Sequence, residues 1–147
     1  MNEHVEQLKA LADFTRLRMI RLFWETREKL CVCEIMDALE VSHSNVSRHL
    51  KILKTAGFVE EKKDGRWVYF FLADSGSPFH KNILLAVGTM PAGLFATDMD
   101  RLQLRVSLRE NGKCVDGVKS GKWTAMLEHI SCGTKNRYNE QPMEYDG

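Results

Sequence analysis

The sequence predicts an α+β fold that is mostly helical and contains one two-stranded β-hairpin. Two observations lead to this prediction. Apolar residues recur at helical spacing through most of residues 5–56. The dipeptide Asp64-Gly65 then separates two short extended runs, which is a strong signal for a tight hairpin turn. Several short helices and one hairpin are therefore expected.

Composition places the chain among folded proteins. Its 147 residues have the length of one ordinary domain, or of a small domain with an appendage. They are 44% apolar and 28% charged, which excludes a disordered or collagen-like chain. Because the net charge is only +1, a nucleic acid, membrane or acidic partner must be argued from local charge.

No export signal and no membrane span are expected. The N-terminus carries acidic residues where a secretory signal carries basic ones. The longest apolar stretch, residues 83–96, is too short to cross a bilayer and is interrupted by Gly and Pro. We therefore expect a cytoplasmic protein, whose four cysteines are thiols or metal ligands before they are disulfides.

Two helices are predicted within residues 5–24. Residues 13–15 separate them, and Thr15 is a plausible cap for the second helix. A third helix is predicted over residues 30–39, where apolar side chains recur at i, i+3, i+4 and i+7. That buried stripe consists of Val32, Ile35, Met36 and Leu39.

A helix-turn-helix followed by a wing is predicted next. Residues 41–44 form a tight polar turn, and residues 45–56 form a fourth helix that Gly57 ends. Residues 59–63 and 66–72 then make a two-stranded hairpin. This order is that of a winged helix-turn-helix, whose second helix enters the major groove of DNA while the wing meets the backbone.

A fifth helix is predicted over residues 79–90, capped by Ser77 with Pro78 at its first position. Its apolar residues exceed what one shielded face requires. Two explanations are open, namely a second copy of the chain and packing on the chain's own first helix. We expect a dimer.

A C-terminal extension follows the winged helix. One helix is predicted over residues 98–109, ended by Asn111-Gly112, and the last fifteen residues are expected to be loose. We therefore divide the chain into residues 1–92, a DNA-binding and dimerisation domain, and residues 93–147, the extension.

Positive charge is concentrated on the predicted reading surface. Residues 42–70 contain six cations and three acids, whereas residues 25–40 contain two cations and five acids. Arg48 and Asn45 are expected to contact base edges, because their side chains can form forked hydrogen bonds. Cations at the hairpin tip reach phosphates and set affinity more than specificity. The predicted DNA-binding residues are Ser44, Asn45, Ser47, Arg48, His49, Lys51, Lys62, Lys63 and Arg66.

Cys31 and Cys33 could bind a soft ion, but not from an intact helix. Residues of a helix advance by about 100° each, so these two side chains would project about 200° apart. Chelation by both would require the first helical turn to unwind or bend. Thiolate bonds to a soft ion exceed the cost of fraying one turn, so this change could act as a switch on the neighbouring recognition helix.

The motifs together resemble the ArsR/SmtB family of metal-responsive bacterial repressors, and most of all its arsenical-responsive branch. The resemblance is carried by residues 11–18 (LADFTRLR), 30–35 (LCVCEI) and 44–50 (SNVSRHL), with the Asp64-Gly65 wing, and covers roughly residues 4–90. It implies a dimeric winged helix whose first and last helices form the dimer. It also implies that the metal-free protein represses a resistance operon until metal binding releases the DNA.

The third sulfur is where the sequence departs from this family. Arsenite sensors often place a third cysteine three residues after the second, but this chain has Met36 there. The third ligand must then be Cys114 or Cys132, unless two sulfurs act with a water or small thiol. Residues 105–115 resemble the tail of some arsenical repressors, which favours Cys114. The expected ligands are Cys31, Cys33 and Cys114, with Cys132 as the alternative.

The expected function is an arsenite- or antimonite-responsive repressor that binds an inverted repeat of operator DNA as a homodimer. The alternative is the same fold sensing cadmium, lead or thiol oxidation. A zinc or nickel site on the last helix of the winged domain is not expected, since only His80 is present there. No CxxC, GxGxxG, GxxxxGK[ST] or HExxH motif occurs, so we expect neither an enzyme nor an organic cofactor.

Overall fold

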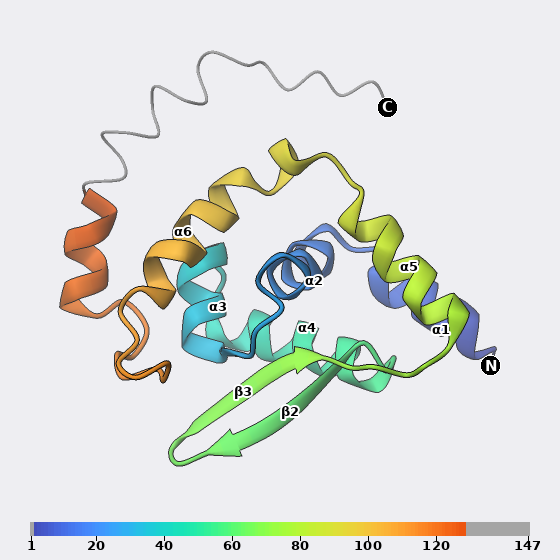
Figure 1. The fold of residues 1–147 in the computed structure, drawn as a ribbon, viewed down its shortest axis with the longest axis horizontal. Helices are drawn as coiled ribbons and strands as arrows, with labels where there is room; N and C mark the ends of the chain where they lie inside the picture. Colours follow the sequence, from blue (N-terminus) through green and yellow to red (C-terminus); the bar gives the residue numbers. More distant parts are fainter. Residues whose placement is uncertain (1, 129–147) are drawn as a thin grey trace.

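The computed structural model describes residues 2–128, and these form a mostly helical fold with one small antiparallel sheet (Figure 1). Figure 1 shows α2 near the centre, α1 with α5 at one end, and α3 with α6 at the other. Residues 121–128 are also helical. The labelled elements are α1 (Glu3–Leu11), α2 (Phe14–Thr26), β1 (Leu30–Cys31), α3 (Val32–Leu39), α4 (His43–Thr55), β2 (Val59–Asp64), β3 (Trp67–Leu72), α5 (Pro78–Gly88), η1 (Ala92–Leu94) and α6 (Ala96–Val106).

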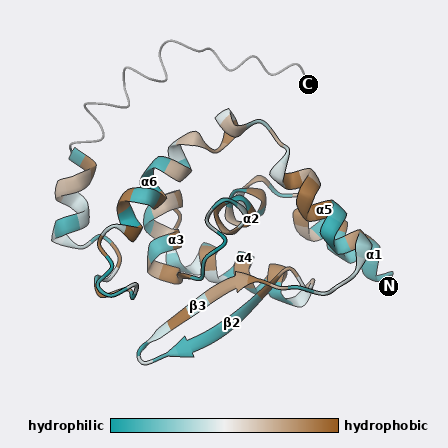
Figure 2. Cartoon of the chain, in the orientation of Figure 1, coloured by the Kyte–Doolittle hydropathy of each residue, from teal (hydrophilic) through white to brown (hydrophobic). Residues whose placement is uncertain are grey.

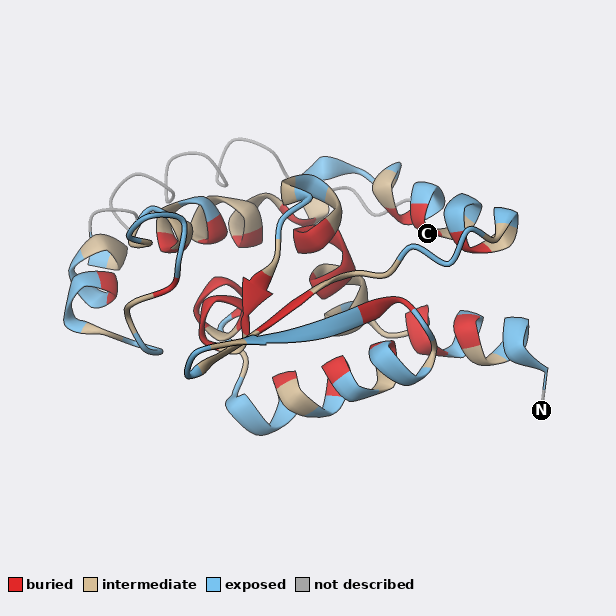
Figure 3. Ribbon diagram, turned by 60° about the horizontal axis from the view of Figure 1, so that its bottom comes forward, coloured by how far each residue is buried: buried red, intermediate tan, exposed pale blue. Residues whose placement is uncertain are grey.

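The helix-turn-helix of α3 and α4 packs on α2 around a single apolar core. Val46, Leu50 and Leu53, the apolar residues at helical spacing along α4, are buried, whereas most other residues of this helix are exposed or partly exposed (Figure 3). Burial of this apolar surface is the main favourable term that holds the three helices together. The core residues of these helices include Met19, Ile20, Leu22, Phe23, Ile35, Ala38, Leu39, Val46, Leu50 and Leu53.

Two helix starts differ from the predictions. Asp13, and not Thr15, caps α2, because its carboxylate accepts a hydrogen bond from the backbone N–H of Arg16 at 3.0 Å. A carboxylate at a helix N-terminus is also favoured by the helix dipole. Helix α4 begins at His43, two residues earlier than predicted, with Ser42 as its cap.

The sheet has three strands in the order β1-β3-β2, which corrects the two-stranded prediction. Leu30 and Cys31 are extended and pair with Phe70 and Tyr69 of β3, so they do not belong to the helix predicted over residues 30–39. The free edge of β3 satisfies their backbone groups. A two-residue strand gives no periodic signal, so the sequence could not reveal it.

The hairpin was predicted correctly and serves as the wing. Asp64 pairs with Trp67, and Gly65 takes a φ of +62° at the tip, where glycine is favoured. Figure 2 shows β2 as hydrophilic and β3 as hydrophobic. This difference follows from position, since β2 is an edge strand with exposed charges and β3 is the central strand.

The remaining helices lie at opposite ends of the core. At one end α5 lies beside α1, and the rings of His4 and Phe79 meet edge to face at 4.6 Å. Leu8 and Leu85 on these two helices are about half exposed. At the other end α6 packs against α3 and ends at Val106, three residues before the predicted end. The last fifteen residues, predicted to be loose, lie outside the described part of the chain.

No helix among residues 2–128 is long and apolar enough to cross a bilayer.

The packing of α4 predicts the effect of truncating one core side chain. Leu53 is fully buried, so Leu53→Ala should lower the free energy of unfolding by about 2–5 kcal/mol through lost burial and a residual cavity. The exposed neighbour Lys51 is the control, and Lys51→Ala should change that free energy by less than about 0.5 kcal/mol. Denaturant unfolding at one protein concentration measures both, and equal effects would contradict this packing.

Candidate metal centre and DNA-binding face

Three cysteine sulfurs meet between β1, the first turn of α3 and the segment after α6. The Sγ of Cys31 lies 2.8 Å from that of Cys33 and 3.1 Å from that of Cys114, and the last two are 3.4 Å apart. All three residues are at most 9% exposed. Residues 31 and 114 are 83 positions apart in the chain, so the tertiary fold alone creates the cluster.

Cys31 and Cys33 can approach each other without any unwinding of α3, because Cys31 precedes the helix. The prediction that the first helical turn must unwind or bend is therefore wrong. Cys31 caps α3 with φ −85° and ψ 161°. Its backbone is therefore extended, and the direction of its side chain does not follow the 100° step per residue of a helix. Its backbone N–H donates to the Glu34 carboxylate at 3.0 Å, which holds the helix start. Both sulfurs therefore converge while the first turn of α3 stays intact.

A tight turn returns the chain so that Cys114 reaches the other sulfurs. We name residues 107–119 the strap. Glu110 and Lys113 exchange two backbone hydrogen bonds of 2.9 and 3.0 Å around Asn111-Gly112, both of which have positive φ, as a two-residue hairpin turn requires. The Asn-Gly pair, predicted to end a helix, instead turns the chain back toward α3.

Buried ion pairs surround the cluster and leave its environment close to neutral. Arg109 donates to both oxygens of Glu34, at 2.6 and 2.7 Å, and Arg105 donates to Asp37 at 2.8 Å. The two carboxylates lie on α3 and are almost fully buried. Bidentate and charge-assisted bonds of this kind satisfy buried carboxylates that would otherwise be costly.

The cluster favours one thiolate. Hydrogen bonds from Cys31 and Cys33 lower the pKa of Cys114 to about 3, although burial alone would raise it, and Arg105 with Arg109 adds to the lowering. The same contact with Cys114 raises the pKa of Cys33 to about 12 and raises the pKa of Cys31. The first proton of the cluster is therefore lost more easily than that of an isolated thiol, and the other two are held more tightly.

Among the described residues, no His, Asp or Glu ligand atom joins this group of three sulfurs. Cys132, the alternative third ligand, lies outside the described residues. Met36, which stands where relatives of the arsenical branch were expected to have cysteine, instead packs against the apolar core. The cluster offers three soft sulfur ligands, and such ligands suit a soft, thiophilic metal or metalloid.

The predicted DNA-binding side chains lie mainly on the outside of α4 and the wing. Ser44, Asn45, Arg48 and Lys51 are exposed on α4, and Ser47 is partly exposed. The exposed cations of the wing are Lys62, Lys63 and Arg66.

His49 differs from the other predicted contacts because it is buried. Its Nδ1 lies 3.1 Å from the guanidinium of Arg16, and its Nε2 lies 3.3 Å from that of Arg48. Burial lowers the pKa of His49, which favours the neutral ring beside these cations. The position suits a packing residue that orients Arg48.

Residues 13–61 match the family described as bacterial regulatory protein, arsR family. An uncharacterised helix-turn-helix-type transcriptional regulator of Methanocaldococcus jannaschii is 41% identical over 69 residues, which are 47% of this chain and 76% of that protein. The chain belongs to the ArsR family. Its members are DNA-binding transcriptional regulators, so the chain is a regulator and not an enzyme, as the sequence predicted.

Two further similarities concern named proteins. The arsenic resistance transcriptional regulator of Pseudomonas putida named ArsR1 is 48% identical over 64 residues, and the chain spans only 49% of its length. The structure of HlyU from Vibrio cholerae superposes with a TM-score of 0.51 at 28% identity, covering 58% of this chain and 87% of that one. The ArsR-family match ends at residue 61, so it includes Cys31 and Cys33 but not the strap.

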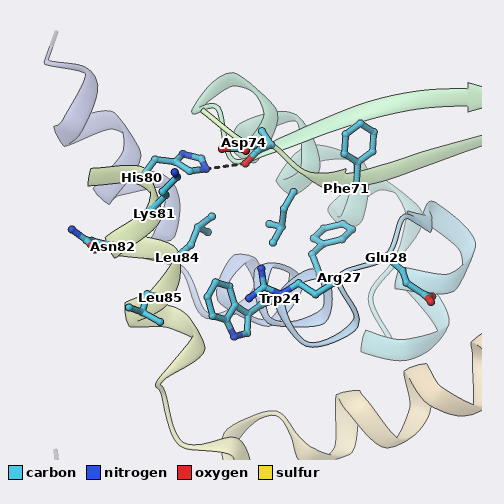
Figure 4. Close-up of a pocket in the computed structure, with 13 residues that line it drawn as sticks. Trp24, Arg27, Glu28, Phe71, Asp74, His80, Lys81, Asn82, Leu84 and Leu85 are labelled. Atoms are coloured by element: carbon cyan, nitrogen blue, oxygen red, sulfur yellow. Dashed lines mark hydrogen bonds between the residues drawn. The ribbon is translucent and has the colours of Figure 1, made fainter. Parts of the chain in front are cut away.

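A groove at the other end of this ArsR-family chain contains none of the three cysteines. It has a volume of about 570 Å³, lies between α2, β3 and α5, and is lined by Trp24, Phe71 and Leu84 among others (Figure 4). His80 borders it, but its ring stacks on Phe58 and its Nε2 lies 3.0 Å from the carbonyl oxygen of Ala73. His80 therefore packs within the fold.

The shared charge of the cluster can be measured. We expect the ultraviolet absorbance of one thiolate per chain at neutral pH, and this absorbance should persist as the pH falls below the ordinary thiol pKa of about 8.5, because the pKa of Cys114 is lowered. Cys114→Ser should remove the signal, whereas the control Cys132→Ser should keep it. A signal that first develops near the ordinary thiol pKa would contradict the assignment.

Proposed function

We propose that the chain is a transcriptional repressor that binds operator DNA as a homodimer and is released by trivalent arsenic or antimony held by Cys31, Cys33 and Cys114. The observation that carries this proposal is the meeting of three buried sulfurs within 3.4 Å of one another. The similarity to an arsenic resistance regulator of Pseudomonas putida supports the choice of inducer.

The number and spacing of the sulfurs favour a trivalent metalloid. A tetrahedral zinc site with Zn–S bonds of about 2.3 Å separates its sulfurs by about 3.8 Å. The sulfurs of the cluster lie 2.8 to 3.4 Å apart, which is nearer to the spacing in the narrower pyramid of arsenic(III), whose lone pair takes the fourth position, than to that of a zinc site. Arsenite, As(OH)₃, reacts with the two thiols, the one thiolate and a proton from solvent to give a neutral As(SR)₃ and three waters.

Charge distinguishes this product from a divalent complex, because the neutral arsenic product removes the thiolate charge of the empty cluster, whereas a divalent ion would leave it in place. Cadmium or lead bound by three thiolates would carry a net charge of −1 in a buried site. Arg105 and Arg109 are the cations that face the cluster, and both are already paired with carboxylates of α3. Burial likewise disfavours thiol oxidation as the primary signal, because reactive thiols are usually partly exposed.

The cluster contacts both parts of the DNA-binding face. Cys31 lies on β1, which pairs with the wing strand β3. Cys33 lies in α3, which a three-residue turn joins to α4. The strap also reaches the wing tip, where Arg66 donates to the carbonyl oxygen of Val115 at 3.4 Å and Lys113 lies 3.7 Å from Asp64. A centre that changes the spacing of the three sulfurs would therefore shift the wing and α4 relative to each other.

The dimer is supported by the apolar residues left exposed on α1 and α5. Val5, Leu8 and Leu85 are between 42% and 52% exposed, and the helices that carry them lie side by side. A two-fold dimer reads an inverted repeat whose half-sites are separated by about one helical turn, roughly 10 base pairs, or a little more. Size-exclusion chromatography with light scattering tests the dimer.

Release by the inducer is the direct test of this function. Arsenite should lower operator affinity in a gel-shift titration. Cys31→Ser, Cys33→Ser and Cys114→Ser should each still bind the operator but resist release, because arsenite then loses one of three sulfurs. Cys132→Ser is the control and should be released like the wild type. Operator binding that arsenite does not change in the wild type would refute the proposal.

The DNA contacts should separate into two kinds. Arg48→Ala should cost about 1–3 kcal/mol of operator affinity and relax the preference at one base position. Lys62→Ala should weaken binding to all sequences alike and reduce the slope of log affinity against log salt by about 1. Equal losses for Arg48→Ala on operator and random DNA would remove Arg48 from base reading.

A further inference from the structure

The third sulfur depends on a segment that the ArsR-family match does not include. Cys114 belongs to the strap, whereas the match ends at residue 61. The strap has no helix or strand of its own apart from one bridge between Glu110 and Lys113. Its position must therefore come from side chains of the rest of the fold.

Tyr69 contacts two of the three segments that carry the sulfurs. Its hydroxyl oxygen accepts a hydrogen bond of 2.9 Å from the backbone N–H of Cys114. Its backbone is the cross-strand partner of Cys31 in the pairing of β1 with β3. The residue is 1% exposed, and the ammonium of Lys29 lies 4.6 Å from the centre of its ring. The buried Tyr69 thus links the strand position paired with Cys31 to the backbone of Cys114.

Other groups hold the strap beyond Cys114. Arg105 donates to the carbonyl oxygens of Asp116 and Gly117, at 2.5 and 3.1 Å. The N–H of Lys119 donates to the carboxylate of Asp37 at 3.0 Å. These bonds lie two or more residues after Cys114. The backbone N–H of Cys114 itself is bound by the hydroxyl of Tyr69.

We propose that Tyr69 is a positioning residue for the third ligand, Cys114. The hydroxyl of Tyr69 holds Cys114 opposite Cys31 before the inducer binds, and this gives the site its preference for inducers that need three sulfurs. This proposal rests on the three-sulfur site proposed above. Without the hydroxyl, the N–H of Cys114 loses its partner and the sulfur is held less firmly, while Cys31 and Cys33 remain in place on β1 and α3.

Two arsenicals that differ in the sulfurs they require test this role. Arsenite takes three sulfurs, whereas phenylarsine oxide takes two, because carbon occupies its third valence and two thiols give PhAs(SR)₂ and one water. Tyr69→Phe keeps the buried ring and removes only the hydroxyl. We expect Tyr69→Phe to weaken arsenite binding by about tenfold to a hundredfold, the range typical of a partner that orients a ligand. Phenylarsine oxide should bind with wild-type affinity.

Three controls make the result specific. Val68→Ala alters the preceding residue of β3, which packs against the main core on the opposite face, and should bind both arsenicals like the wild type. Adding Tyr69→Phe to Cys114→Ser should cause no further loss for arsenite, since the sulfur that the hydroxyl positions is already absent. Hydrogen exchange at the N–H of Cys114 should be faster in Tyr69→Phe.

The possible failures can be told apart. Wild-type arsenite affinity in Tyr69→Phe, equal weakening of both arsenicals, or a further loss in the double variant would each overturn the role of Tyr69. If Cys114→Ser binds arsenite as tightly as the wild type, the three-sulfur site itself is wrong.

Discussion

The pairing of Leu30 and Cys31 with β3 is the constraint on which the rest of the site depends. Two backbone residues join the free edge of the wing and thereby keep Cys31 extended at the start of α3. The sulfurs of Cys31 and Cys33 then meet at 2.8 Å without distortion of the helix. The same pairing ties the cluster to the wing, so the three sulfurs and the hairpin are joined through one strand ladder.

A second constraint is the buried ionic frame that joins α3 to the C-terminal extension. Glu34 and Asp37 are 0% and 3% exposed, and their charges are matched by Arg109 and Arg105. An unpaired carboxylate in such a place is strongly destabilising, so α3 requires the extension for its own stability. The extension is thus a structural part of the regulator as well as the source of Cys114.

The buried ion pairs around the cluster favour the proposed inducer. A neutral product of arsenic(III) and the three sulfurs leaves no net charge on the buried cluster, whose neighbouring cations are already paired with carboxylates. The sulfurs are held close before binding, so little ordering is needed when the inducer enters. Induction would then act through a small adjustment where β1, α3 and the strap meet, and unfolding of a helical turn is not needed.

The sequence by itself determined the features that depend on residues close together in the chain. Helical periodicity located the helices and the buried face of α4, Asp64-Gly65 located the hairpin, and residue type identified the exposed cations of the DNA-binding face. It also identified Cys31 and Cys33 and favoured Cys114 over Cys132. Only the tertiary structure decided the extended state of Cys31, the burial of His49 and the contact of Tyr69 with the strap. Each of these arises from groups far apart in the chain, which satisfy one another's buried polar atoms only after folding and leave no local pattern.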